Sequence, residues 1–302
     1  MAVPSVSLSP EGPTLSRLAL GLWRLNEWDM DAAALRGYVE ACLDLGITTF
    51  DHADIYGGHT CEEQFGAALD GHSSLRDRMQ IVTKCGIMLP SENRPGIERQ
   101  HYDTSREHII ASAEHSLQAL GIECIDLLLI HRPDPLMDPD AVAEAFHTLQ
   151  RDGKVQHVGV SNFTPSQVAL LDDRVDGRLV TNQVQASLLH HDPFLDGTFD
   201  QCQQRRIAPM AWSPLGGGRL FSSDAPPMPA LRNVMAEVGR AQGGASLAQV
   251  AYAWLLRHPA GIVPVLGTGR IDRVRGAAEA TAIELTRPQW FRLWETAGGA
   301  IP

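Results

Sequence analysis

The stretch Thr48-Thr49-Phe50-Asp51-His52-Ala53-Asp54-Ile55-Tyr56-Gly57-Gly58 decides how the rest of the chain is interpreted. Residues 46–50 form an apolar run with β-branched residues, which predicts a buried strand. The run ends at Asp51, and the polar residues and double glycine that follow indicate a turn. In a barrel of parallel strands the carboxyl ends of the strands form the functional face, so Asp51 and Tyr56 are expected there.

Apolar runs alternate with amphipathic segments along the rest of the chain, which predicts a parallel sheet. We expect a (β/α)8 TIM barrel with an N-terminal β-hairpin over residues 5–8 and 14–17, which plugs the amino end, and a C-terminal helix, all in a single domain over residues 1–302. An open doubly wound sheet is the alternative, but no strand precedes Gly-x-Gly-x-x-Gly and eight units favour closure. The expected strands are 17–21, 48–51, 80–84, 126–131, 158–161, 180–183, 209–213 and 262–267.

Capping residues mark the starts of several expected helices. We expect a capping box at Thr104 and helix starts at Thr164-Pro165, Ser246 and Thr286, each ahead of a helical pattern. The segments 88–102 and 224–229 are expected to be long loops after the third and seventh strands.

Composition limits the classes of function. With 25 basic and 36 acidic residues among 302, the net charge of −11 disfavours nucleic acid and anionic lipid as partners but allows a locally basic pocket for an anionic cofactor. The five cysteines are an odd number without Cys-x-x-Cys spacing, which favours reduced thiols in the cytoplasm over a disulfide framework or a zinc site. We expect no signal peptide and no membrane-spanning segment.

Two further charged residues end expected strands. Lys84 closes the third strand and His131 the fourth, so both should meet Asp51 and Tyr56 on one rim. A lysine ammonium within about 4–6 Å lowers the pKa of a tyrosine from about 10. Asp51 would keep Lys84 charged, and His131 would donate a hydrogen bond to an oxygen that gains negative charge. These four catalytic candidates are suited to protonating a carbonyl oxygen.

Hydride cannot come from a protein side chain, so reduction of a carbonyl requires a nicotinamide cofactor. Ser161 and Asn162 end the fifth expected strand and Gln183 the sixth, and their hydroxyl and amide groups suit a carboxamide. Trp212, at the end of the seventh, offers a ring on which nicotinamide can stack. Each residue alone also has a structural interpretation: a helix cap, a core amide or a packing residue.

The segment Gly267-Thr268-Gly269-Arg270-Ile271-Asp272-Arg273 follows the eighth expected strand. Glycine-rich backbone that leads into a helix N-terminus binds anions, and barrels often hold phosphate at this place. The guanidinium groups of Arg270 and Arg273 suit a 2′-phosphate, which predicts NADPH over NADH. The structural alternative is that both arginines are solvated helix charges.

Ordered motifs along the chain resemble the aldo-keto reductase superfamily, and the segment from His131 to Leu136, His-Arg-Pro-Asp-Pro-Leu, is similar to its bacterial branch of predicted oxidoreductases. The resemblance spans residues 17 to about 280. The matching stretches are Phe50-Asp51-His52-Ala53-Asp54-Ile55-Tyr56-Gly57, Val82-Thr83-Lys84, Asp126-Leu127-Leu128-Leu129-Ile130-His131, Gly153-Lys154-Val155, Gly159-Val160-Ser161-Asn162-Phe163, Asn182-Gln183-Val184 and Trp212-Ser213-Pro214-Leu215.

This resemblance implies an NADPH-dependent carbonyl reductase in which Asp51, Tyr56, Lys84 and His131 form a tetrad and Tyr56 donates the proton. It further implies that two residues after the first strand lie beside the nicotinamide ribose and that three residues after the seventh run along the pyrophosphate. These residues are Leu22 and Trp23 for the ribose, and Ser213, Leu215 and Gly216 for the pyrophosphate.

The substrate is expected to be a small aldehyde or ketone. The pocket should be lined by residues 88–102, 132–138 and 221–229, but loops of unknown shape do not identify a ligand. The sequence leaves the oligomeric state open as well.

Two other functions are considered. An NADP(H)-binding redox sensor or regulatory subunit would keep the fold with little turnover, although an intact tetrad argues against it. A metal-dependent hydrolase would use Asp51, Asp54, His131 and the pair His190-His191 as ligands. That scheme has no role for the lysine and lacks a His-x-His motif.

Overall fold

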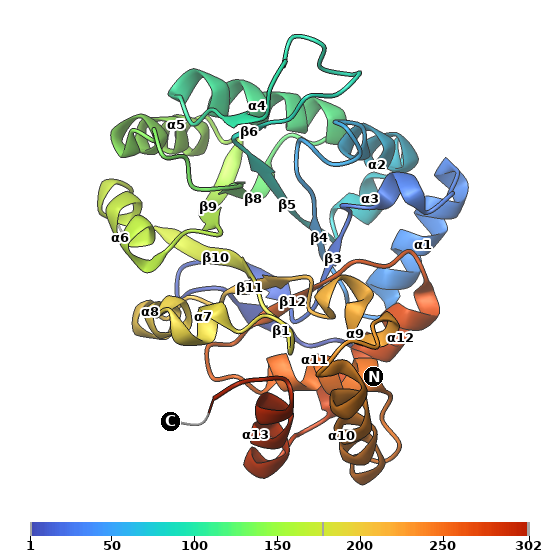
Figure 1. Ribbon diagram of the computed structural model, residues 1–302. Helices are drawn as coiled ribbons and strands as arrows, with labels where there is room; N and C mark the ends of the chain where they lie inside the picture. Colours follow the sequence, from blue (N-terminus) through green and yellow to red (C-terminus); the bar gives the residue numbers. More distant parts are fainter. Residues whose placement is uncertain (1, 177, 301–302) are drawn as a thin grey trace.

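Eight parallel strands form a closed barrel in the computed structural model, which describes residues 2–176 and 178–300. Helices surround the barrel on the outside (Figure 1). The expected (β/α)8 fold is therefore confirmed. In order around the barrel the strands are β10 (Leu179–Gln185), β11 (Met210–Trp212), β12 (Val263–Leu266), β3 (Ala19–Gly21), β4 (Thr49–Asp51), β5 (Gln80–Cys85), β8 (Ile125–Ile130) and β9 (Val155–Ser161).

Each expected strand is found, and the differences at the ends have local causes. Strand β9 begins at Val155 instead of residue 158, because Val155 already pairs with Ile125 of β8. Strand β3 begins at Ala19 instead of residue 17, because the backbone N–H of Arg17 donates to the carbonyl of Pro4 in the preceding hairpin, at 2.8 Å.

The register of neighbouring strands brings their carboxyl ends to one rim. Gly21 of β3 pairs with Asp51 of β4, which in turn pairs with Val82 of β5. A Cβ at Gly21 would lie 2.8 Å from a methyl carbon of Val265 on β12, so the close approach of these strands requires glycine. The strand ends, and the side chains on them, therefore lie around a common mouth.

The N-terminal hairpin is confirmed and fills the opposite end of the barrel. Strands β1 (Ser5–Ser7) and β2 (Thr14–Ser16) pair in antiparallel fashion. Leu8 and Leu15 are buried in one apolar cluster with interior residues of the barrel strands, which include Val82, Leu127, Leu129, Met210 and Val263. The hairpin thus closes the amino end, and access to the interior is from the carboxyl rim.

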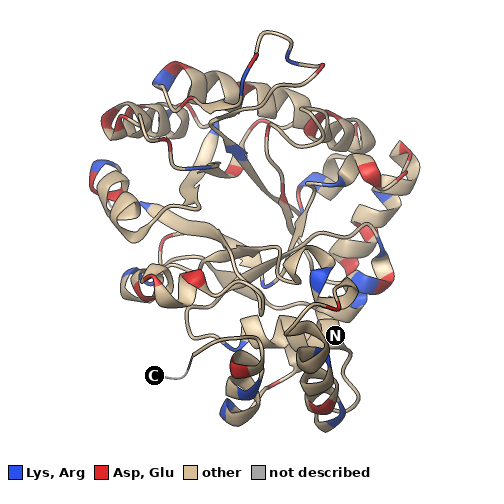
Figure 2. Ribbon diagram, viewed as in Figure 1, with Lys and Arg blue, Asp and Glu red and all other residues tan. Residues whose placement is uncertain are grey.

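The helix starts expected at Thr164, Ser246 and Thr286 are confirmed, and each of these residues forms a capping box. Charged residues are concentrated on the outer helices and loops, while most of the barrel carries none (Figure 2). The helices are α1 (Ala32–Asp44), α2 (Cys61–Leu69), α3 (Ser73–Arg76), α4 (Arg106–Leu120), α5 (Pro139–Arg151), α6 (Pro165–Arg174), α7 (Asp192–Leu195), α8 (Thr198–Arg205), α9 (Arg219–Ser222), α10 (Met228–Ala241), α11 (Leu247–Leu256), α12 (Ile271–Glu279) and α13 (Arg287–Thr296), with short 3-10 turns η1 (Leu25–Glu27), η2 (Gly216–Gly218) and η3 (Ala280–Ala282).

The expected capping box at Thr104 is wrong. Ser105 is the N-cap of α4 and accepts a hydrogen bond from the backbone N–H of His108, whereas the hydroxyl of Thr104 donates to Asp134 at 2.9 Å. The segment 88–102 is also more regular than a loop, because β6 (Ile87–Met88) and β7 (His101–Tyr102) pair as a short hairpin. In the segment 224–229, α10 already begins at Met228.

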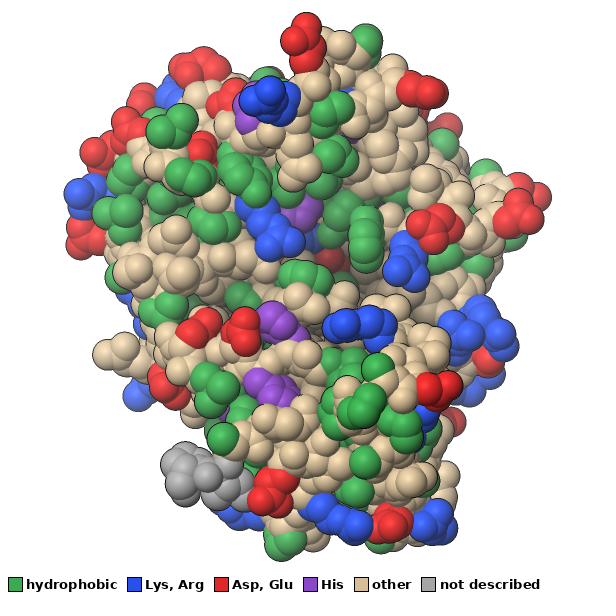
Figure 3. Space-filling view, in the orientation of Figure 1, with side chains coloured by type: hydrophobic (Ala, Val, Ile, Leu, Met, Phe, Trp, Pro, Cys, Tyr) green, Lys and Arg blue, Asp and Glu red, His purple; other side chains and the backbone are tan. Residues whose placement is uncertain are grey.

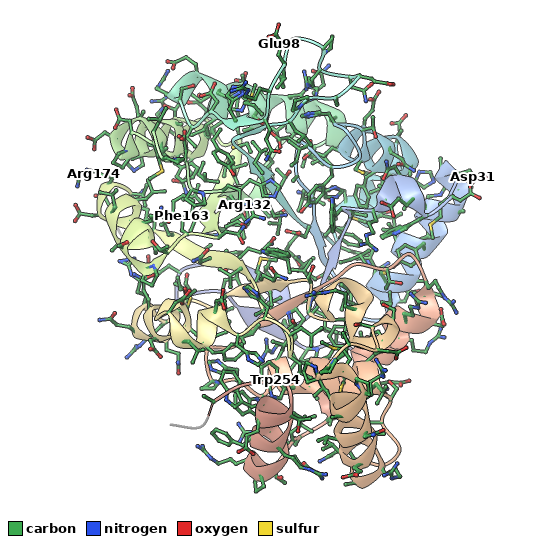
Figure 4. All side chains as sticks on the ribbon, in the orientation of Figure 1. Asp31, Glu98, Arg132, Phe163, Arg174 and Trp254 are labelled. Atoms are coloured by element: carbon green, nitrogen blue, oxygen red, sulfur yellow. The ribbon has the colours of Figure 1, made fainter. Side chains whose placement is uncertain are left out.

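The C-terminal helix packs against α11 through stacked indoles. Trp254 of α11 is completely buried (Figure 4), and its ring lies 4.9 Å from that of Trp290 on α13 with an angle of 10° between the planes. Each indole N–H donates to the main-chain carbonyl of the other tryptophan, so both buried donors are satisfied. This arrangement explains the apolar stripe of the last helix.

We expect Leu15→Ala to lower the free energy of unfolding by about 2–5 kcal/mol, because it leaves a cavity where the hairpin closes the barrel. Urea unfolding measures this change. Leu136→Ala, at a side chain that is 91% exposed, is the matched control and should change the value by less than about 0.5 kcal/mol. Equal effects of the two substitutions on the free energy of unfolding would contradict the conclusion that the hairpin closes the amino end of the barrel.

Candidate active site

The four predicted catalytic residues lie on the carboxyl rim of the barrel. Asp51 is the last residue of β4, Lys84 is the last but one of β5, and His131 directly follows β8. Tyr56 lies in the turn after β4. Figure 3 shows a hollow over the centre of this face, with histidine and basic side chains at its edge. The barrel therefore delivers four chemically different side chains to one mouth.

The ammonium of Lys84 is at the centre of the site. Its Nζ donates to Asp51 Oδ2 at 2.8 Å and to the main-chain carbonyl of His52 at 2.6 Å, and it lies 3.2 Å from the hydroxyl oxygen of Tyr56. Lys84 is 1% exposed. The other carboxylate oxygen of Asp51 accepts from the amide of Gln183 on β10 at 2.8 Å. A buried charge is thus surrounded by polar partners, as burial requires.

Burial sets the protonation states of Tyr56 and Lys84. Burial raises the pKa of Tyr56, and the opposing effect of the Lys84 charge does not cancel it, so the expected net lowering of this pKa is wrong. Burial by itself lowers the pKa of Lys84, but the charge of Asp51 and the proximity of Tyr56 outweigh it and raise the pKa. The pair is therefore a neutral phenol beside an ammonium ion.

His131 is a neutral imidazole at the wall of the mouth. Burial, with smaller contributions from Lys84 and Arg132, holds the pKa of His131 well below its usual range. Its ring lies 5.9 Å from that of Tyr56 in an edge-to-face arrangement. A neutral imidazole donates a hydrogen bond from one nitrogen and accepts with the other, so His131 can contact a substrate oxygen without carrying charge.

The four residues predicted to contact nicotinamide form one hydrogen-bonded chain. The Ser161 hydroxyl donates to the main-chain carbonyl of Gln183 at 2.8 Å and accepts from the Asn162 amide at 2.7 Å. The Asn162 side-chain oxygen accepts from the indole N–H of Trp212 at 2.9 Å. These residues are thus brought together beside the tetrad, and their polar groups form hydrogen bonds with one another. To bind a carboxamide, they would have to break some of these hydrogen bonds.

The two residues after the first barrel strand occupy different environments. The Leu22 side chain is fully buried, and its backbone N–H donates to the carbonyl of Asp51 at 2.9 Å. Trp23 is 58% exposed and carries the guanidinium of Arg24 over its ring at 5.2 Å. Of the two, only Trp23 offers a side chain at the surface.

The loop after β11 has an unusual backbone conformation. Ser213 has a φ of 51° and Gly216 a φ of 61°, and the Gly216 N–H donates to the Ser213 carbonyl at 2.8 Å. The positive φ of Gly216 favours glycine, and a Cβ there would also lie 2.7 Å from a terminal methyl carbon of Leu189. Leu215 packs its side chain into the core. The turn of the chain at this point is therefore fixed by packing.

The glycine-rich segment before α12 is held in place by aromatic residues. The hydroxyl of Tyr38 donates to the carbonyl of Thr268, and Gly269 packs against Trp28, which a Cβ would approach to 2.6 Å. Gly267 faces open space, since a Cβ there would meet no atom within 4 Å. The backbone at Gly267, ahead of this helix, is therefore open to solvent.

The two arginines of this segment behave differently. Arg270, the N-cap residue of α12, pairs with Asp272 through two contacts of 3.1 and 2.8 Å. Both side chains are exposed, so the pair is weak and open to exchange. Arg273 is exposed and forms no ion pair within the part of the chain that the structure describes. Only Arg273 presents a free guanidinium.

Two carboxyl groups behind the tetrad, Glu62, which is buried, and Asp54, which is half-buried, were not assigned a role from the sequence. Glu62 accepts hydrogen bonds from the hydroxyls of Thr83 and Ser116. Asp54 accepts from Ser112 of α4 at 2.8 Å and therefore turns away from the mouth. The polar residue Thr83, next to Lys84 in a buried strand, is the signal that would have indicated a partner on the outer face of the barrel.

Across residues 2–176 and 178–300, no group of three or more His, Cys, Asp and Glu side chains is arranged to hold a metal ion. Within the same ranges, no helix is both long and apolar enough to cross a membrane.

Comparisons with known proteins agree with this fold. The model of the aldo/keto reductase family matches residues 17–296, so the chain belongs to that family. Oxidoreductase YdhF of Escherichia coli is 52% identical over 297 residues, covering 98% of each chain. A 6-dehydroglucose reductase of Agrobacterium fabrum is 48% identical over 287 residues, covering 94% of this chain and 95% of that protein.

A solved structure shares the fold over nearly the full length. The thermostable aldo-keto reductase Tm1743, crystallised with the inhibitor epalrestat, has a TM-score of 0.82 and 26% sequence identity, and the match covers 97% of this chain and 99% of that one. Family, relatives and fold together support an oxidoreductase that acts on small carbonyl compounds.

We expect Asp54→Asn to become progressively more stable than the wild type as pH rises. Burial raises the pKa of Asp54 to about 7, so the stability due to its protonated form is fully present below about pH 4 and is lost as pH rises through about 7. Asparagine keeps an acceptor for Ser112 and does not ionise. The difference in free energy of unfolding should grow by about 1 kcal/mol or more between about pH 5 and pH 8 in urea titrations. A difference that is constant with pH would contradict the burial of Asp54.

Proposed function

We propose that the protein reduces an aldehyde or ketone to an alcohol with NADPH, and that Tyr56 donates the proton. The observation that carries this proposal is the distance of 3.2 Å between Lys84 Nζ and Tyr56 Oη, with Asp51 2.8 Å from the same ammonium. A phenol whose pKa lies above 10 is protonated at neutral pH, so it is ready to act as an acid. The ammonium beside it stabilises the phenolate left after proton transfer.

The residues beside the tetrad fit a nicotinamide nucleotide. Trp212 offers an aromatic ring, Asn162 and Gln183 offer amides that match a carboxamide, and the open N-terminus of α12 offers backbone N–H groups for a phosphate. A bound NADPH would supply the hydride for the carbonyl carbon. The chain's own residues orient the carbonyl and provide the proton.

The four catalytic candidates have different roles at the substrate oxygen. Tyr56 transfers its hydroxyl proton to that oxygen as a new C–H bond forms at the carbon. His131, as a neutral donor, binds the same oxygen and stabilises its growing negative charge. Lys84 carries the compensating positive charge, and Asp51 with the main-chain carbonyl of His52 holds it in place. The phenolate then regains a proton from solvent.

The preference for NADPH over NADH rests on the start of α12. Arg273 is free to bind a 2′-phosphate, and a phosphate can replace Asp272 as the exposed partner of Arg270. Because exposed pairs are weak, this exchange requires little energy.

The experiment is a turnover assay that follows the absorbance of reduced nicotinamide with a panel of aldehydes and ketones. We expect turnover with NADPH, less with NADH, and a loss of at least about 100-fold in kcat for Tyr56→Phe, because the general acid is gone. Phenylalanine keeps the ring, so binding of NADPH, followed by tryptophan fluorescence, should persist. Tyr252→Phe, at a buried tyrosine of the outer helix α11, is the matched control. Unchanged turnover in Tyr56→Phe would refute the assignment of the acid.

A further inference from the structure

Arg132 occupies a position in the mouth that the reaction described above does not use. It follows His131 at the end of β8 and points into the mouth of the barrel (Figure 4). Its guanidinium lies over the ring of Trp212, 5.5 Å from the centroid. Strands β8 and β11 are not neighbours in the barrel, so the side chain reaches across the mouth.

No acidic partner neutralises Arg132. Throughout residues 2–176 and 178–300, no ion pair or hydrogen bond involves its side chain, although it is only partly exposed. The carboxylate two residues further along, Asp134, is already bound to the hydroxyl of Thr104 at 2.9 Å and to the N–H of Leu136 at 2.8 Å. The contact with the indole restrains the guanidinium without using its N–H groups, which stay free to donate hydrogen bonds. Such an arginine is prepared for a planar anion.

The charges around Arg132 leave the mouth positive. Lys84 and Asp51 form an ion pair, and Tyr56 and His131 are neutral, so Arg132 supplies the remaining positive charge. This charge also acts on the reacting groups, since Arg132 lowers the pKa of Tyr56 and of His131 in addition to the larger effects of burial and Lys84. In a chain with a net charge of −11, an unpaired cation at this place is a specific feature of the site.

We propose that Arg132 selects carbonyl substrates that carry an oxyanion, a carboxylate or a phosphate ester, within a few bonds of the carbonyl. This inference rests on the proposed function, because it assigns a substrate class to the same site. Arg132 directly follows His131 and its charge acts on both Tyr56 and His131, so its guanidinium lies beside the groups that bind the carbonyl oxygen. An indole has two faces, so Arg132 on one face of Trp212 leaves the other for nicotinamide. Two parallel N–H···O bonds from Arg132 would then fix the charged end of the substrate while Tyr56 and His131 bind the carbonyl oxygen.

The test compares kcat/KM for matched charged and neutral aldehydes at saturating NADPH. Succinic semialdehyde against butanal tests the carboxylate, and glyceraldehyde 3-phosphate against glyceraldehyde tests the phosphate. In the wild type we expect the charged member to be favoured by about tenfold or more in at least one pair. In Arg132→Gln this ratio should fall to about 1, mainly through KM for the charged aldehyde. Arg132→Lys keeps the charge but not the planar fork, so it should give an intermediate ratio.

Arg240→Gln is the control for long-range charge effects. Arg240 is exposed on α10, at the outside of the barrel, and forms no ion pair within the described part of the chain, so its removal changes the net charge equally and should leave the ratio unchanged. Raising the salt concentration should lower the ratio in the wild type but not in Arg132→Gln.

Three results would overturn the inference. The first is a wild-type ratio near 1 for both pairs, and the second is an equal loss for charged and neutral aldehydes in Arg132→Gln. The third is a fall in the ratio for Arg240→Gln that matches the fall for Arg132→Gln. Each of these leaves NADPH-dependent reduction itself intact. If no aldehyde of either pair is reduced, the proposed function fails, and this inference fails with it.

Discussion

The site depends on one buried positive charge and the groups that compensate it. An ammonium that is 1% exposed would lose its proton unless partners favoured the charged form. Asp51, the carbonyl of His52 and the hydroxyl of Tyr56 are those partners for Lys84, and Gln183 in turn holds Asp51. Breaking a buried pair of this kind typically costs about 3–5 kcal/mol, so these side chains have little freedom to leave their positions.

The barrel holds this ion pair at its open end, where a substrate can reach it. The hairpin plugs the amino end with Leu8 and Leu15, so the interior opens only at the rim where the charges lie. Strands β4, β5, β8 and β10 bring polar groups to that rim, and the barrel interior beneath the rim is apolar. In such surroundings the phenol of Tyr56 stays protonated and the imidazole of His131 stays neutral. A proton donor and an uncharged hydrogen-bond donor are thus maintained side by side.

Much of the fold could be predicted because it depends on local patterns. Apolar strands that end in Asp51, Lys84 or His131 are visible in the sequence, as are the caps at Thr164 and Thr286. The features that were missed depend on contacts between distant segments. Thr104 is not the cap of α4 because Asp134, thirty residues away, takes its hydroxyl. The direction of the pKa shift of Tyr56 depends on how deeply its side chain is buried. The guanidinium of Arg132 is free because of which carboxylates lie near it in space. The spacing of residues along the sequence predicts neither property.

The central claim is that the ammonium of Lys84 stabilises the phenolate of Tyr56, and NMR of the tyrosine ring carbons that carry the hydroxyl tests it most directly. The chain has four tyrosines, so few signals appear, and Tyr56→Phe identifies the relevant one. In a double variant, Lys84→Met with Asp51→Asn, both charges of the ion pair are removed, while burial and the smaller effect of Arg132 act on the phenol in both proteins. We expect that, as the pH is raised, the Tyr56 signal begins to titrate at lower pH in the wild type than in the double variant. Titration at the same pH in both proteins, or at lower pH in the double variant, would contradict the claim.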